Sequence, residues 1–190
     1  MPVTPGRVAW YVTGRFYEDS EKRLQDLGYF LHMEGIRGSL FNGAVGEGTA
    51  RLTFRSQPFA AGSFTNGDIA IGLDERGEFS VYLNPEGGAS FGDPDSFSRG
   101  LCVATFRRTS VVMGETLSST ALGGFAISMN VFSAELVASA PFELEGATYN
   151  FRGLLPAGIT QWGTLSGNAL AVFPPFTRIS AFTGSAIAAG

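Results

Sequence analysis

The sequence predicts an all-β protein, an antiparallel closed barrel of about 8–10 strands with a short N-terminal helix. Two observations carry this prediction. From residue 28 onward, short segments rich in Phe, Val, Ile, Thr and Tyr alternate with Gly, Asn, Asp and Pro. The chain also holds 26 glycines and 17 phenylalanines, a composition typical of many short strands joined by tight corners. Closure into a barrel removes exposed strand edges, and a two-sheet β-sandwich is the alternative.

The chain is expected to form a single domain over residues 1–190. Hydrophobic residues make up 44 % of it and charged residues 16 %, which predicts a packed globule rather than a disordered chain. No break in composition marks a second domain, and a chain of this length can bury one core.

The expected N-terminal helix covers residues 17–27, "YEDSEKRLQDL". Ser20 or Asp19 is suited to cap its first turn. Leu24 and Leu27 would then lie on one side of the helix.

The first predicted hairpin follows, with its turn at Asn42-Gly43, the strongest short signal for a two-residue β-turn. A turn at these residues places Glu34 opposite Arg51. It also places His32, the single histidine of the chain, opposite Thr53.

This register gives the hairpin one polar and one apolar face. Leu31 and Met33 are predicted to point to the core, and His32 and Glu34 to lie on the other face. Two interpretations of the polar face stay open. Glu34 forms a cross-strand ion pair on the protein surface, or the barrel turns this face inward and His32 exchanges protons with a ligand.

The second predicted hairpin spans residues 69–83 around a three-residue loop, Glu75-Arg76-Gly77. One face of this hairpin is wholly apolar. Its predicted core residues are Ile69, Ile71, Leu73, Phe79, Val81 and Leu83.

Residues 84–100 predict a long loop, of the length that often forms a lid or a binding element. Asp93, Asp95 and Asn84 supply oxygen ligands that suit calcium, but their spacing is not that of an EF-hand. No metal site is therefore predicted.

The next strand, residues 101–113, carries Arg107 and Arg108 in its middle. Successive side chains of a regular strand point to opposite faces, so one guanidinium should point inward. The stronger apolar alternation runs through Leu101, Val103 and Arg107, which favours Arg107 as the inward residue. A bulge, or a strand end at which both arginines reach water, is the alternative.

The C-terminal third contains further apolar runs broken by glycine and predicts further strands. Residues 154–163, "LLPAGITQWG", are expected to form a second long loop. Trp162 would provide a flat apolar wall there.

Charge and composition exclude several classes of function. The net charge is −4 and Lys22 is the single lysine, so the chain lacks the basic footprint of a nucleic-acid-binding protein. Cys102 is the single cysteine, which excludes an intrachain disulfide and suits a reducing compartment. Neither a signal peptide nor an apolar run of ~18 residues is present, so we expect a cytoplasmic protein without membrane contact.

Three classes of function remain, none of which needs a cofactor. The first is binding of a small, largely apolar molecule, with or without an acidic group, in a barrel cavity. The second is a cofactor-independent enzyme, an isomerase, cyclase or lyase that transfers protons in that cavity. The third is a structural or interaction protein with a filled core, and a homo-oligomer stays open in each class. The predicted ligand contacts are Arg107, Arg51, Thr53 and Trp162. The predicted catalytic residues are His32, Glu34 and Tyr82.

Overall fold

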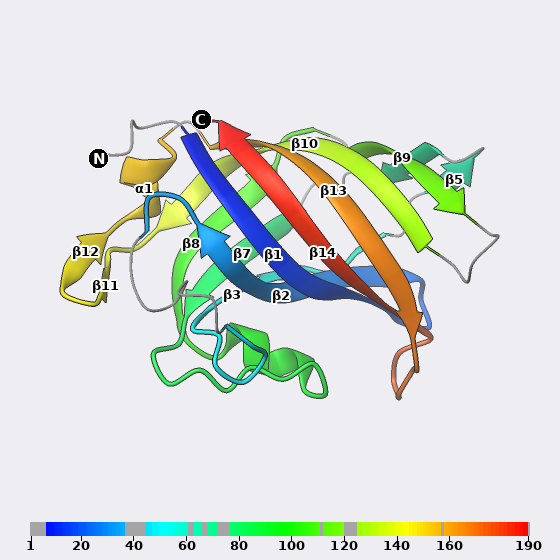
Figure 1. Cartoon of the computed structure of the whole chain (residues 1–190), viewed down its shortest axis with the longest axis horizontal. Coiled ribbons are helices and arrows are strands. Elements are labelled where there is room, and N and C mark those ends of the chain that lie inside the picture. The colour runs from blue at the N-terminus through cyan, green and yellow to red at the C-terminus, as the bar shows by residue number, and fades with distance from the viewer. Residues whose placement is uncertain are drawn as a thin grey trace.

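The computed structural model describes residues 7–36, 45–60, 63–65, 68–71, 77–110, 112–119, 125–156 and 158–189. These residues are mostly antiparallel β structure with almost no helix (Figure 1). The strands are β1 (Arg7–Glu18), β2 (Arg23–Met33), β3 (Leu52–Ser56), β4 (Phe59–Ala60), β5 (Ser63–Thr65), β6 (Asp68–Ile71), β7 (Glu78–Leu83), β8 (Leu101–Arg108), β9 (Val112–Ser119), β10 (Phe125–Ser139), β11 (Phe142–Leu144), β12 (Ala147–Tyr149), β13 (Ile159–Leu170) and β14 (Arg178–Ala189). The two short helices are η2 (Pro94–Ser98), a 3-10 helix, and α1 (Phe151–Leu154).

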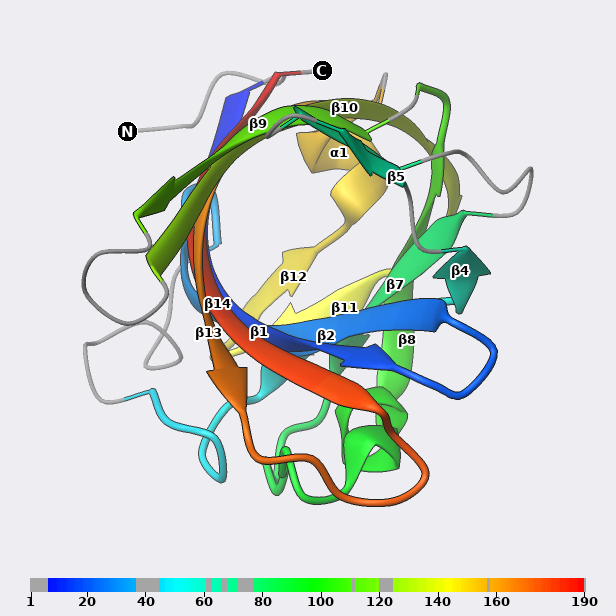
Figure 2. The same ribbon diagram turned by 90° about the vertical axis from the view of Figure 1, so that its right-hand side faces the viewer.

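One large sheet contains most of these strands and curls into a half-barrel (Figure 2). Within the described ranges it has 12 strands, in the order β13-β14-β1-β2-β3-β7-β8-β10-β9-β6-β5, with β4 paired to β2. The long strand β10 also pairs with β13. Strands β11 and β12 form a separate hairpin.

The predicted N-terminal helix is wrong, because residues 17–27 form the end of β1, a tight turn and the start of β2. Asp19 does not cap a helix here. Its Oδ1 atom accepts hydrogen bonds from the backbone N–H groups of Glu21 and Arg23, both at 2.9 Å. Lys22 has a φ of 59° in the same turn. The local side chain therefore stabilises a turn that returns the chain antiparallel to β1.

The predicted register of the first hairpin is also wrong. In the structure Tyr29, rather than His32, lies opposite Thr53. The predicted turn at Asn42-Gly43 lies outside the described residues. The described pairing of β2 with β3 runs from Leu27 to Tyr29, and its register differs from the one that a two-residue turn at Asn42-Gly43 would set.

The second predicted hairpin does not form either. Strand β6 pairs with β5 and β9, whereas β7 pairs with β3 and β8. Phe79, Val81 and Leu83 are buried, as predicted. The side chains of Ile69, Ile71 and Leu73 lie outside the described part of the chain.

Apolar side chains cover both faces of the sheet near β1 and β2. The inner cluster includes Phe30, Phe54, Phe79, Phe106 and Phe182. The outer cluster joins Tyr17, Leu27 and Tyr29 to Phe91 and Phe97 of the 84–100 loop.

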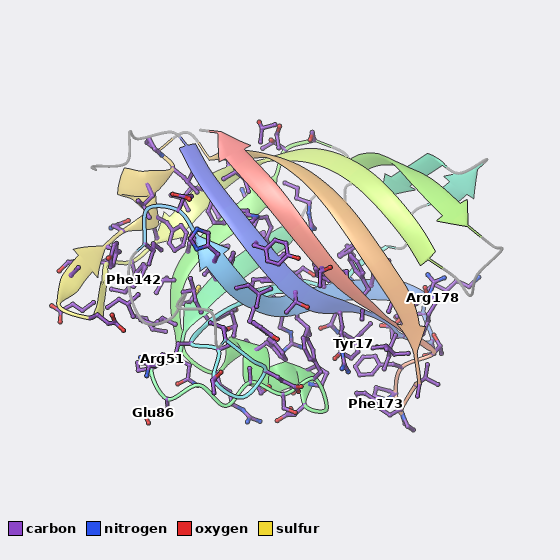
Figure 3. All side chains as sticks on the ribbon, in the orientation of Figure 1. Tyr17, Arg51, Glu86, Phe142, Phe173 and Arg178 are labelled. Carbon is purple, nitrogen blue, oxygen red and sulfur yellow. The ribbon has the colours of Figure 1, made fainter. Side chains whose placement is uncertain are left out.

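One end of the curl lies beside α1 and the β11–β12 hairpin (Figures 1 and 2). There Phe151 packs edge-on against Phe106, with ring centroids 6.2 Å apart. Phe142 belongs to the same inner cluster and marks this end in Figure 3. None of the described helices has the length and apolar character needed to cross a membrane.

Candidate functional site

A β-bulge in β8 decides which arginine faces the inner side of the sheet. Tyr82 of β7 lies opposite Cys102. The next pair joins Val81 to Ala104, so Val103 is an extra residue without a partner on β7. One extra residue reverses the alternation of side chains for the rest of the strand.

Arg108 is therefore the inward arginine, and its side chain is only 8 % exposed. Its guanidinium carbon lies 5.0 Å from the centre of the Phe59 ring and 5.6 Å from that of Phe79. Its Nη2 atom lies 3.6 Å from Oδ1 of Asp26. A guanidinium cannot lose its charge, and here the carboxylate and the aromatic faces offset part of the cost of its burial.

Asp26 supplies the carboxylate from β2. Its backbone N–H donates to Oγ of the buried Ser56 at 2.9 Å, which fixes the strand position. Its Oδ1 atom has no contact with solvent and accepts no hydrogen bond from the described residues. The side chain is nevertheless 20 % exposed, so the exposed part of the carboxylate is at Oδ2.

A second ion pair lies near the same end of β2. Glu18 of β1 is opposite Leu24, two residues from Asp26, and its side chain is 17 % exposed. Nη2 of Arg178 donates to Oε2 of Glu18 at 2.6 Å. Figure 3 shows Arg178 at the end of the sheet far from Phe142. The two pairs bring together two positive and two negative charges.

The prediction that Arg107 points inward is wrong. Arg107 lies on the outer face with its side chain 45 % exposed. Its Nε and Nη2 atoms donate to Oε1 of Glu78 at 3.0 and 2.8 Å, and Glu135 lies 3.7 Å away. Since the alternation through Val103 is broken by the bulge, Arg107 forms an ordinary surface ion pair.

His32 and Glu34 lie on the protein surface, with side chains 54 % and 58 % exposed and Nε2 3.4 Å from Oε1. Glu34 pairs with His32, so the predicted pair of Glu34 with Arg51 does not form. Met33 is buried, as predicted. Leu31 packs instead against the outer cluster, because the register of β2 against β1 shifts there.

Two predicted ligand contacts hold the 84–100 loop. Oγ1 of the buried Thr53 donates to the carbonyl oxygen of Phe97 at 2.7 Å. The carbonyl oxygen of Arg51 accepts from the backbone N–H of Asn84 at 2.8 Å. Figure 3 shows Arg51 and Glu86 among the loops below the sheet. Neither Arg51 nor Thr53 is part of the inner cluster.

A groove of about 260 Å³ lies on the outer face. It is lined by Gln25, Arg55, Ser56, Gln57, Pro58, Ser80, Tyr82 and Ser98. Arg55 is held by four hydrogen bonds, three of them to residues of η2 and one to Gln25 at 3.0 Å. The groove includes Tyr82 but neither His32 nor Glu34, so the predicted catalytic residues do not share it.

Trp162 is the remaining predicted ligand contact. Trp162 lies within β13 rather than in a loop, opposite Val131 and Ile187, and its side chain is outside the described part of the chain. Asp93 pairs with Arg99, and Asp95 pairs with Arg55. Among the side chains that the structure describes, no group of three or more His, Cys, Asp and Glu residues is placed to hold a metal ion.

Comparison with known proteins finds no family model, no curated protein and no solved structure that matches the chain. The candidate site therefore rests on geometry. Of the described groups, the Asp26–Arg108 pair has the most unusual environment, since it places charge beside the apolar inner cluster.

Sequence reasoning missed Asp26 because it lies in the segment expected to be helical. If residues 23–33 are instead interpreted as a strand, the alternation of side chains predicts the position of Asp26. Leu24, Asp26, Gly28 and Phe30 alternate along one face, so an inward carboxylate follows from the same rule that places Phe30 in the core.

Proposed function

We propose that the protein binds a small, largely apolar molecule on the inner side of its curled sheet, with the polar end of that molecule at Asp26 and Arg108. The observation that carries this proposal is the burial of Arg108, 8 % exposed, between two phenylalanine rings. A buried charge pair is costly unless further hydrogen bonds satisfy it. Oδ1 of Asp26 accepts no hydrogen bond from the described residues, and a polar ligand group would supply a partner for this carboxylate.

The inner cluster supports an apolar frame for the ligand. Five phenylalanines of β2, β3, β7, β8 and β14 belong to it. Ligand sites commonly combine aromatic and aliphatic walls with a few convergent polar groups. The Asp26–Arg108 pair would be the polar group of such a site.

We also propose that the sheet closes into a barrel around this site. The support is the pairing of β10 with β13 over nine residue pairs, from Ala126 with Gly167 to Ala134 with Ile159. Strand β10 pairs with β8 as well, so this pairing links the two sides of the curl (Figure 2). Cavity-bearing barrels enclose ligands in this way.

Calorimetric titration with a panel of fatty acids, aromatic acids and the corresponding alcohols tests the binding function. Replacement of Arg108 with Met keeps the apolar stem and removes the charge. We expect Arg108→Met to weaken binding by about 1–3 kcal/mol, because it removes one charge of the buried pair that holds the polar end of the ligand. Arg107→Met is the matched control on the outer face and should bind as the wild type does.

Equal affinities of the wild type and of both variants would contradict the role of Arg108. Absence of binding by every member of the panel would contradict the binding function and favour a structural or interaction protein with a filled core.

No observation favours the alternative of a cofactor-independent isomerase, cyclase or lyase. His32 and Glu34 are surface residues, and Tyr82 lines the outer groove. Acid–base catalysis requires its groups within hydrogen-bonding reach of one bound substrate. We therefore place binding before catalysis.

A further inference from the structure

We infer that the bound molecule carries an uncharged hydrogen-bond donor, such as a hydroxyl or an amide, which binds the Asp26 carboxylate. This inference rests on the binding function proposed above and specifies the chemical class of the ligand. It depends on the hydrogen bonding of Asp26, on the charges that face this carboxylate and on its exposure.

The hydrogen bonding of Asp26 is incomplete. Oδ1 accepts no hydrogen bond from the described residues, and Nη2 of Arg108 at 3.6 Å is beyond hydrogen-bonding distance. An ionised carboxylate has about four acceptor positions and no donor. It therefore depends on its exposed oxygen, Oδ2, for hydrogen bonds. A ligand group that donates satisfies that oxygen, whereas an ester or ether leaves it unsatisfied.

The Asp26 carboxylate already faces a positive charge, and so does Glu18 on the neighbouring strand. Arg108 faces Asp26, and Arg178 is paired with Glu18 at 2.6 Å. A ligand carboxylate would add a negative charge next to that of Asp26, in surroundings where little water screens it. An uncharged donor adds none. The site should therefore prefer an alcohol or an amide to the corresponding acid.

Asp26 lies on the face of β2 that carries the inner cluster, and part of its side chain is exposed. Asp26 alternates on β2 with Phe30, which belongs to the inner cluster, and 20 % of its side chain is exposed. Phe59 and Phe79 flank Arg108 and are themselves buried, so the ion pair has apolar surroundings on that side.

The experiment compares four head groups on each of two carbon frames, by calorimetric titration of the wild-type protein. The octyl series is octan-1-ol, octanamide, methyl octanoate and octanoate. The naphthyl series is 2-naphthylmethanol, 2-naphthamide, methyl 2-naphthoate and 2-naphthoate. Within the series that binds, we expect the alcohol and the amide to bind about tenfold or more tightly than the ester, since only they donate to a charged acceptor. The acid should bind more weakly than the alcohol.

Two results overturn the inference in different ways. If the ester binds as tightly as the alcohol, or the acid binds most tightly, the donor is wrong while the binding function stands. If none of the eight compounds binds, the binding function fails and this inference fails with it.

The variant Asp26→Asn assigns the preference to this carboxylate. Asparagine both donates and accepts, so the preference for alcohol over ester should fall to about twofold or less. Glu78→Gln is the matched control, because Glu78 pairs with Arg107 on the outer face. If Asp26→Asn does not fold, the double variant Asp26→Asn with Arg108→Met removes both charges and should also lose the preference. An unchanged preference in either folded variant overturns the assignment to Asp26.

Discussion

Arg107 and Arg108 are neighbours in the chain, yet one extra residue in β8 gives them opposite environments. Arg107 has a short hydrogen bond to Glu78 and 45 % of its side chain exposed to water. Arg108 has a longer contact with Asp26 and almost no exposure. Contact distance alone would rank the outer pair as the stronger one. Burial reverses this order, because the loss of one partner of a buried pair leaves a charge without compensation.

The stability of Arg108→Met and Arg107→Met tests this order. We expect Arg108→Met to lower the free energy of unfolding by about 1–3 kcal/mol, less than for a wholly buried pair because water reaches part of Asp26. Arg107→Met should cost less than about 1 kcal/mol, as exposed pairs do. Urea denaturation at neutral pH measures both. Equal losses would show that Arg108 and Asp26 do not stabilise one another.

We expect the free energy of unfolding to depend on pH through Tyr17, a residue of the outer cluster. Its hydroxyl donates to the carbonyl oxygen of Phe91 at 2.8 Å. Burial raises the pKa of this hydroxyl above its ordinary value, Arg15 opposes the rise, and Glu47 adds to it. The unfolded chain therefore loses this proton first. The stabilisation is complete below the ordinary pKa of about 10 and is lost as the pH rises from there through the raised pKa.

Urea denaturation between about pH 8 and 11 measures this loss. Tyr17→Phe removes the ionisable group, so its stability should fall less steeply above about pH 10 than that of the wild type. Parallel curves for the two proteins would exclude Tyr17 as the cause.

At the scale of elements, the sequence predicted strand composition well and register poorly. Phe79, Val81 and Leu83 are buried on β7 as their alternation required. Alternation failed at Leu31 and Val103, where the register shifts. Local residue types do not reveal a shift that depends on the partner strand. For this reason the sequence correctly predicted that one guanidinium points inward. It selected Arg107, whereas the inward residue is Arg108.

The expected helix failed for a related reason. Asp19 and Ser20 are good cap residues, but Asp19 is equally suited to a tight turn. Pairing of β1 with β2 over nine residue pairs decides between the two. Asp26 lies in this segment. Because the strand was not predicted, the sequence did not identify the Asp26 carboxylate as an inward-facing group.

The 84–100 loop is held on the sheet by Arg55. Its Nη1 atom donates to the carbonyl oxygen of Pro94, to Asp95 and to Ser98 at 3.4, 2.8 and 3.1 Å. We expect Arg55→Met to increase amide hydrogen exchange of η2 by roughly 5- to 100-fold, because local opening no longer breaks these bonds. Hydrogen exchange with mass spectrometry measures this effect.

Arg99→Met is the control for this loop. Arg99 pairs with Asp93 in the same loop, and both side chains are largely exposed, 63 % and 47 %. Its removal should leave exchange in η2 nearly unchanged. Equal effects of the two variants would mean that Arg55 does not anchor the loop.

At the scale of the whole molecule, the β10–β13 pairing decides how well the inner face is enclosed. Strand β10 pairs with β8 along its C-terminal half and with β9 along its N-terminal half. Its other edge is paired with β13, which continues through β14 and β1 to β2. If this pairing persists in solution, the inner face is enclosed and its hydrogen-bonding edges are satisfied.

A designed disulfide tests this pairing. Ser133 of β10 lies opposite Thr160 of β13, with their hydroxyl oxygens 3.2 Å apart. Ser80 of β7 and Thr105 of β8 form an equivalent pair inside the sheet, at 2.9 Å. Directly opposed residues of antiparallel strands have Cβ atoms about 4.5–5.5 Å apart, close to the separation across a disulfide. In a Cys102→Ser background, we expect both Ser133→Cys/Thr160→Cys and Ser80→Cys/Thr105→Cys to oxidise readily.

The pair Ser80 and Thr105 is the control for the pair Ser133 and Thr160. The β7–β8 pair reports whether such positions can form a disulfide in this sheet, independently of closure. Mass spectrometry of the folded, oxidised proteins measures the loss of two hydrogens at each pair. A disulfide at Ser80 and Thr105 without one at Ser133 and Thr160 would mean that β10 and β13 separate in solution. The inner face would then be open along that edge, and the proposed ligand site at Asp26 and Arg108 would be a cleft rather than an enclosed cavity.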